Sequence, residues 1–151
     1  MKHEALSQQI IGGFYTVYNT LGYGFLEKVY ENALAIELRR LGLRVECQRP
    51  ITVHYRGYVV GEYFADMVIE DAIIIELKAV RVMAKEHEAQ LINYLNATDY
   101  EVGLLLNFGP KPNIRRKVFD NERKRHRNGA RMATDRAGPK EGDGSPPVEC
   151  C

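Results

Sequence analysis

The chain has 151 residues, of which 45% are hydrophobic and 27% are charged, and its formal net charge is +1. These values are ordinary for one globular domain with its own core, and they exclude a strongly basic or strongly acidic protein. No apolar stretch approaches the roughly 18–20 residues of a membrane span, and the first residues lack the apolar segment of a signal peptide. We therefore expect no membrane association and a cytoplasmic location.

Two helices are expected before residue 42. Apolar residues recur with a helical period from Glu4 to Asn19 and more strongly from Phe25 to Leu41. Gly42 follows as a residue suited to end the second helix. The charged residues of that helix are expected mostly on its outer face, and they are Glu31, Glu37, Arg39 and Arg40.

The apolar pattern then changes to that of strands. Four runs with strand character follow, at residues 43–48, 51–55, 58–60 and 63–69. Pro50 separates the first two runs and Gly61 separates the last two. Residues 72–77 are apolar except for Glu76, which is typical of a strand buried on both faces. Glu70-Asp71, between the last two strands, is short enough to form a hairpin turn.

The second half of the chain is expected to contain a helix from Ala84 to Asn96, a buried strand at 102–108 and a short element at 114–119. This order of elements predicts an α/β or α+β fold, with a central mixed sheet flanked by helices. After about Asn121 the apolar content almost disappears. We therefore interpret residues 1–120 as the folded domain and residues 121–151 as a disordered basic and polar tail.

Charged residues occupy an unusual place at the end of the most apolar strand. Side chains alternate along a strand, so Glu76 and Lys78 share a face, about 6.6 Å apart. Burying charge costs several kcal/mol unless the charge is paired or bound to a metal. The predicted hairpin would also bring Asp66, the single acid of the run at 63–69, close to both. Two acids and a lysine at a sheet edge suit a hard cation with a proton-handling group beside it.

Two helices carry further polar candidates. Glu27 lies in the first turn of its helix, where a carboxylate is also favoured simply as a cap of unsatisfied N–H groups. Tyr30 is three residues further on and shares its face. Gln90 and Tyr94 are four residues apart and therefore lie on one face of the later helix. We interpret both tyrosines as framework residues.

Taken together, these spacings resemble the PD-(D/E)XK nuclease superfamily: Asp66, nine residues, Glu76-x-Lys78, then a helix with Gln90-x-x-x-Tyr94. Residues 24–30, Gly-Phe-Leu-Glu-Lys-Val-Tyr, match the GxxExxY signature of the protein family named for it, and the resemblance runs from about residue 8 to 119. The chain departs from the common pattern at Tyr18 in place of histidine and at Tyr23 in place of proline. Ala65 also precedes the acid where the superfamily name has proline.

The resemblance implies a restriction-endonuclease-like core and a Mg²⁺-dependent phosphodiesterase site, with Mn²⁺ as a substitute metal and DNA as the substrate. In that scheme Asp66 and Glu76 ligate the metal and Lys78 orients or deprotonates the attacking water. Glu27 matches an additional acid that ligates the metal directly or through water. Gln90 and Tyr94 would position the site or the scissile phosphate.

Three functions are compatible with these residues. The first is a metal-dependent nuclease. The second is a nucleic-acid- or partner-binding module that has kept the fold and has weak or no turnover, which the modest positive charge favours. The third is a structural protein in which the acids and the lysine form only an ion-pair network. A homodimer is compatible with each of them.

Overall fold

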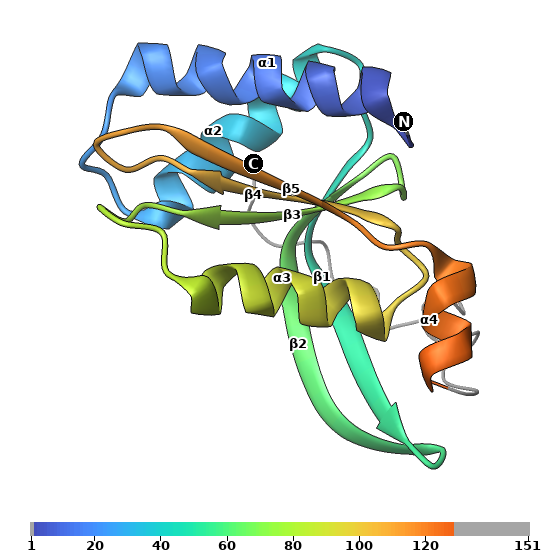
Figure 1. Cartoon of the computed structure of the whole chain (residues 1–151). Coiled ribbons are helices and arrows are strands. Elements are labelled where there is room, and N and C mark those ends of the chain that lie inside the picture. Colours follow the sequence, from blue (N-terminus) through green and yellow to red (C-terminus); the bar gives the residue numbers. More distant parts are fainter. Residues whose placement is uncertain (1, 129–151) are drawn as a thin grey trace, which may run out of the picture.

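A computed structural model describes residues 2–128, which form four helices and five strands (Figure 1). In chain order they are α1 (Glu4–Leu21), α2 (Glu27–Arg40), β1 (Val45–Tyr55), β2 (Tyr58–Ile69), β3 (Ile73–Lys78), α3 (Lys85–Ala97), β4 (Val102–Asn107), β5 (Asn113–Val118) and α4 (Asn121–Asn128). The predicted class, α+β with a central mixed sheet, is confirmed. None of the helices within residues 2–128 combines the length and the apolar character needed to cross a lipid bilayer.

The strands form one sheet in the order β1-β2-β3-β4-β5. β3 and β4 are parallel and are joined through α3, whereas every other neighbouring pair is antiparallel. The predicted hairpin turn is present between β2 and β3. Glu70 and Asp71 both have positive φ, 53° and 50°, at the centre of a tight turn in which the N–H of Ala72 donates to the carbonyl of Ile69, and the pair Ile69–Ile73 gives the loop three residues. Gly42 also takes a positive φ, 87°, directly after α2, where the sequence predicted the helix to end.

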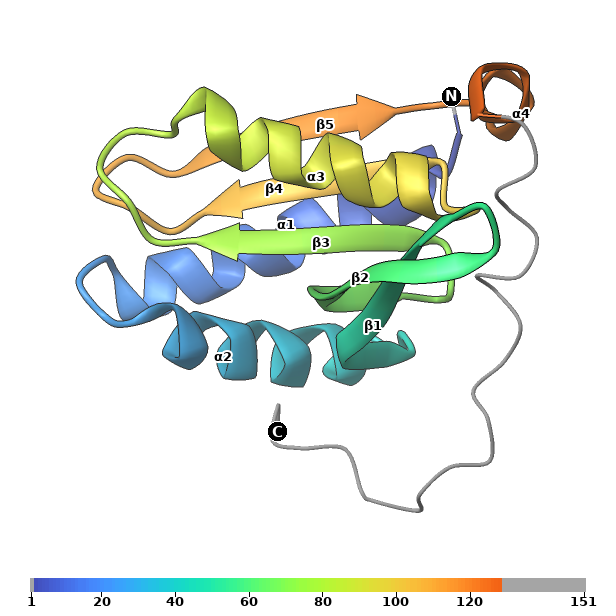
Figure 2. The same cartoon turned by 90° about the horizontal axis from the view of Figure 1, so that it is seen from below.

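Helices cover both faces of the sheet. α1 and α2 lie against one face and α3 lies against the other, as the two perpendicular views show (Figures 1 and 2). Residues 73–77 of β3 and all of β4 are buried, which confirms the interpretation of these apolar runs as central strands. The end of β3 therefore lies between helical layers, and this placement sets the environment of Glu76.

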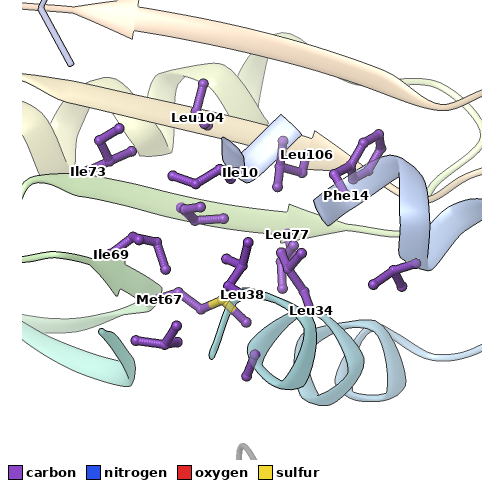
Figure 3. Close-up of a cluster of buried hydrophobic side chains, with 14 of the residues drawn as sticks. Ile10, Phe14, Leu34, Leu38, Met67, Ile69, Ile73, Leu77, Leu104 and Leu106 are labelled. Atoms are coloured by element: carbon purple, nitrogen blue, oxygen red, sulfur yellow. The ribbon is translucent and has the colours of Figure 1, made fainter. Parts of the chain in front are cut away.

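Two hydrophobic cores result from this layering. The larger core lies between the sheet and the α1–α2 layer and contains Phe14, Leu34 and Ile75 (Figure 3). The smaller core lies under α3 and contains Ile74 and Leu91. Ile74 and Ile75 thus point to opposite cores, as alternation along a strand requires. Each fully buried side chain of this size contributes about 1.5–3 kcal/mol through removal of apolar surface from water.

β1 and β2 continue beyond the sheet as a two-stranded arm, here defined as residues 49–65. β1 pairs with β2 from Val45 to Tyr55, but β2 pairs with β3 only from Met67 to Ile69. The arm therefore projects beside α3 (Figure 1). The predicted break at Pro50 is wrong, because this residue lies inside β1, at the sheet edge, where a missing N–H is tolerated.

The predicted break at Gly61 is also wrong, because β2 runs without interruption from Tyr58 to Ile69. Gly61 pairs with Val53, and the register shifts directly after that pair, between Val53 and His54. The irregularity that glycine signals in a strand is therefore a bulge in the arm and not a turn.

β2 changes its orientation at Asp66. Met67 packs in the core under α1 and α2, whereas Ala65 packs in the core under α3. Residues two apart on a flat strand would share a face, so the strand twists strongly between these two residues. The facing strand shows the same irregularity, because Gln48 has a positive φ of 55°. Asp66 thus lies at the junction between the sheet and the arm.

The region expected to be a disordered tail begins with a helix. The ammonium group of Lys124 in α4 is buried and donates hydrogen bonds to the backbone carbonyls of Leu95, Thr98 and Tyr100, at 2.6, 2.9 and 2.5 Å. These carbonyls lie in or just after the last turn of α3, where a positive charge is favoured by the helix dipole. This capping explains why residues 121–128 are helical despite their polar sequence. The rest of the predicted tail, residues 129–151, lies outside the described residues.

Candidate active site

The candidate site forms where the β2–β3 ladder ends. The register pairs Met67 with Ile75, and the next step would place Asp66 opposite Glu76. At this position the carboxylates of the two acids, and not backbone carbonyls, accept hydrogen bonds from main-chain N–H groups. The backbone N–H of Asp66 donates to Glu76 Oε1 at 3.1 Å, and the N–H of Leu77 donates to Asp66 Oδ2 at 2.8 Å. The predicted proximity of the two acids is confirmed, and each carboxylate is held by a main-chain donor.

Both carboxyl groups bind a proton more tightly than in water. Burial and, after it, the neighbouring charge of Asp66 raise the pKa of Glu76 to about 8. Burial likewise raises the pKa of Asp66 to about 6, with smaller contributions from the charges of Glu31 and Glu27. The hydrogen bonds from the main chain lower both pKa values but do not compensate for burial. The site therefore concentrates negative charge that favours a proton or a cation.

Lys78 contributes charge without forming an ion pair. It follows Glu76 on the same face of β3 and is half-buried, and its charge lowers the pKa of both acids. No ion pair within 4.0 Å joins it to either carboxylate in the described part of the chain. A closed ion-pair network, the structural interpretation of this triad, is therefore not what the described residues form. The ammonium group is left to act on something other than its two neighbours.

The chain after Lys78 is fixed by the end of β4. The amide of Asn107 donates to the carbonyl of Val80 and accepts from its N–H, both at 2.9 Å, and the N–H of Phe108 donates to the carbonyl of Lys78 at 2.7 Å. A Cβ atom at Gly109 would lie only 1.9 Å from the Val80 carbonyl oxygen, so this close approach requires glycine. These contacts fix the backbone from which the Lys78 side chain extends.

The N-terminus of α2 approaches the carboxylates from the α1–α2 side. Glu27, the first residue of α2, is exposed and lines a cleft of about 170 Å³ together with Asp66 and Leu77. Tyr30 fixes the loop before the helix, since its hydroxyl donates to the carbonyl of Gly22 at 2.6 Å and its ring stacks on Phe108 at 4.4 Å. The structure thus brings Glu27 to the acids and shows Tyr30 as a framework residue, as interpreted from the sequence.

Glu31 is a site residue that the sequence reasoning missed. It was expected on the outer face of its helix, but it is only 4% exposed and lines the same cleft as Glu27 and Asp66. Lys28 Nζ lies 2.7 Å from Glu31 Oε2, and Gln48 Nε2 donates to Oε1 at 2.8 Å. The available signal was spacing, because Glu31 follows Glu27 by four residues and must share its helix face. The cleft therefore contains three acids.

Gln90 and Tyr94 approach from the opposite side, on α3. Gln90 Nε2 donates to the Tyr94 hydroxyl at 2.8 Å. Burial and then the charges of Glu76 and Asp66 raise the pKa of Tyr94 to about 12, so this hydroxyl lies within electrostatic range of both acids. The predicted pairing on one helix face is confirmed, and the pair forms the α3 wall of the site.

The donor set suits a magnesium ion. No group of three or more His, Cys, Asp or Glu side chains within residues 2–128 is close enough to form a ready metal cage. Mg²⁺, however, is usually bound by one or two carboxylates, with waters and substrate oxygens completing its octahedron. Asp66 and Glu76 are adjacent, oxygen-only donors whose mutual repulsion a divalent cation would remove. The residues therefore fit this metal.

Comparisons with known proteins give a match to a solved structure and a match to a family profile. A solved structure described as "Crystal structure of SSO0001" aligns with 86% of this chain and 70% of its own, at 17% sequence identity and a TM-score of 0.44. The comparison with curated proteins finds no match. A family profile described as "PD-(D/E)XK nuclease superfamily" matches residues 4–117, which include all the candidate residues above. The chain therefore belongs to the PD-(D/E)XK nuclease superfamily.

Proposed function

We propose that this protein is a Mg²⁺-dependent nuclease that hydrolyses phosphodiester bonds of DNA. The observation that supports it most is the adjacent pair of Glu76, which is buried, and Asp66, which is half-buried, with no cation bonded to either among residues 2–128. Such a pair is costly to keep in a fold unless it binds something. Membership of the nuclease superfamily supports phosphodiester hydrolysis as the reaction in which this pair of acids takes part. The GxxExxY match at residues 24–30 supports a place in that narrower group.

Each residue has a role in this proposal. Asp66 and Glu76 hold the metal, and Glu27 adds a carboxylate at the mouth of the cleft. When bound, Mg²⁺ neutralises charge on the phosphate and lowers the pKa of a coordinated water. Lys78 orients the attacking water by donating a hydrogen bond to it or, as the neutral amine, accepts its proton, and no ion pair among the described residues holds this half-buried group elsewhere. Gln90 and Tyr94 position the scissile phosphate from α3.

The test is a cleavage assay on supercoiled plasmid and on single-stranded DNA, with Mg²⁺, Mn²⁺ or EDTA. We expect metal-dependent cleavage that falls at least about 100-fold in Asp66→Asn and Glu76→Gln, which remove metal ligands. Lys78→Met should reduce the rate by about 10²–10⁴-fold, the usual contribution of a proton-transferring group. Glu62→Gln is the matched control, because this exposed acid lies on the same strand as Asp66 but in the arm, and it should leave cleavage unchanged.

The alternatives give different results in the same experiment. Metal binding by calorimetry and DNA binding without cleavage would favour a binding module on the nuclease fold. Absence of both metal binding and cleavage would show that the acids are structural. Cleavage that persists in Glu76→Gln would place the active site elsewhere.

A further inference from the structure

A large cavity lies between the arm and α3, next to the candidate active site. Its volume is about 710 Å³, within the range of pockets that enclose a small organic ligand. Residues of β1, β2 and α3 line it, among them Tyr63, Glu86, Gln90, Asn93, Tyr94 and Asn96. The cavity is not needed to hold the metal, because neither Asp66 nor Glu76 lines it.

The cavity and the acids share a wall. Gln90 and Tyr94 line the cavity and are bonded to each other at 2.8 Å, and the Tyr94 hydroxyl is within electrostatic range of Glu76. A chain whose phosphate lies at the acids would therefore place a neighbouring group at the cavity mouth. Arg81, in the segment that joins β3 to α3, and Lys85, the first residue of α3, are both exposed and are cations available to a polynucleotide backbone.

The lining suits a planar, neutral, hydrogen-bonding ligand. Tyr63 is 50% exposed and its ring centroid lies 5.8 Å from that of Tyr94, so an aromatic face is open to stacking. None of the lining residues is Lys or Arg, and the lining acid Glu86 would repel a phosphate. The amide side chains of Gln90 and Asn93, which also line the cavity, carry hydrogen-bond donors and acceptors for the edge of such a ring.

We propose that this cavity receives an unpaired nucleobase of the strand being cut, so that the protein acts on single-stranded or locally unpaired DNA. The inference rests on the proposed nuclease function and specifies its substrate. A base inside a duplex is stacked and paired, and it enters a pocket between protein side chains only after it leaves the stack. Stacking on an aromatic side chain accepts any base, so the cavity selects for strand state and not for sequence.

Binding in EDTA tests the proposal without cleavage. Fluorescence anisotropy compares a labelled single-stranded 15-mer of thymidine, a duplex of equal length, and a 15-mer of abasic units with the same phosphates. We expect the single strand to bind at least about tenfold more tightly than the duplex or the abasic chain. Tyr63→Ala should weaken single-strand binding by about 5- to 150-fold, the range for loss of one base–aromatic stack. It should change binding of the abasic chain less than twofold.

Tyr58→Ala is the matched control. Tyr58 is 76% exposed, lies at the tip of the arm on the same strand as Tyr63, and does not line the cavity. We expect this variant to bind all three ligands like the wild type. Asn93→Ala, on the exposed side of α3, gives a second cavity variant that does not depend on the arm, and it should weaken single-strand binding alone.

The outcomes separate this inference from the proposed function. Equal binding of the abasic and base-containing chains, or equal losses in Tyr63→Ala and Tyr58→Ala, would overturn the base pocket even if the protein cleaves DNA. Base-dependent binding in a protein that never cleaves would overturn the nuclease and leave the pocket. If Tyr63→Ala changes the oligomeric state of the protein in solution and leaves its affinity for DNA unchanged, the cavity is an interface between two copies of the chain and the proposal fails.

Discussion

The central strands and the arm are built from similar residues but in opposite environments. β3 and β4 pair on both sides, and residues 73–77 and 102–107 are buried. In the arm, residues 58–65 of β2 pair with β1 on one side and have no strand on the other. The exposed fractions of Tyr58, Val60 and Phe64 are 76, 61 and 54%. An isolated two-stranded ribbon is marginally stable in water. The sheet therefore carries the stability of the domain, and the arm extends from it.

The candidate site lies where these two regions meet. β2 leaves β3 at Asp66, and the two ladder bonds that would follow are replaced by bonds to the carboxylates of Asp66 and Glu76. A regular ladder would give these acids no backbone N–H groups to accept from. The end of the ladder thus supplies donors that hold two like charges close together, and the comparison shows why the acids lie there and not within the sheet.

The largest expected effect distinguishes the two regions by stability. Ile75→Ala removes a fully buried side chain from the core under α1 and α2, and it should lower the free energy of unfolding by about 2–5 kcal/mol. Val60→Ala, a similar truncation in the arm, should cost less than about 0.5 kcal/mol because its side chain is 61% exposed. Urea unfolding followed by circular dichroism measures both. Similar losses in the two variants would show that the arm folds as part of the core.

The sequence predicted the region that depends on local pattern. The run at 72–77, apolar except for Glu76, predicted a central strand, and the two-residue spacing at Glu70-Asp71 predicted the hairpin. Counting back from a two-residue turn places Asp66 opposite Ile75 and next to Glu76; the observed pair Ile69–Ile73 adds one residue to the loop and brings Asp66 opposite Glu76. The fold and the acidic pair therefore follow from periodicity, turn length and the charge at the end of a buried strand.

What the sequence could not give depends on contacts between distant elements. Pro50 is tolerated in β1 only because that strand is at the sheet edge, which is a property of topology. Glu31 is buried because Gln48, from the next element, satisfies its carboxylate. α4 is helical where the tail was expected to be disordered because Lys124 caps α3, 26 residues from its acceptor at Thr98. None of these partners is visible in a local window of sequence.

The second prediction concerns pH at the junction. The folded pKa values of Asp66 and Glu76, about 6 and about 8, lie above their ordinary values of 3.8 and 4.5. The folded state therefore binds protons more tightly than the unfolded state. The stability from this pair is complete below about pH 4 and is lost as the pH rises through 6 and then 8.

The measurement is thermal unfolding of the metal-free protein between pH 5 and pH 9. We expect Glu76→Gln to be more stable than the wild type at pH 9, by on the order of 1–2 kcal/mol, and to lose the upper part of the pH dependence. Mg²⁺ should stabilise the wild type more at pH 9 than at pH 6, because binding displaces protons. If the stability of the wild type, relative to that of Glu76→Gln, rises between pH 5 and pH 9, the pKa of Glu76 is not raised in the folded protein. Glu62→Gln, in the arm, should leave the profile unchanged.

The smallest expected effect lies at the tip of the arm. The guanidinium carbon of Arg56 lies 5.6 Å from the ring centroid of Tyr55, and an exposed contact of this kind contributes about 0.5–1 kcal/mol locally. If the arm opens without unfolding the sheet, the tip is already open before the core unfolds. The Arg56–Tyr55 contact then contributes nothing to the free energy of global unfolding. Arg56→Ala should then change the free energy of unfolding by less than about 0.3 kcal/mol. In hydrogen exchange, the arm amides should exchange about two- to fivefold faster and those of β3 at an unchanged rate. Faster exchange in β3 would instead show that arm and sheet open together, and the junction at Asp66 would then be no mechanical boundary.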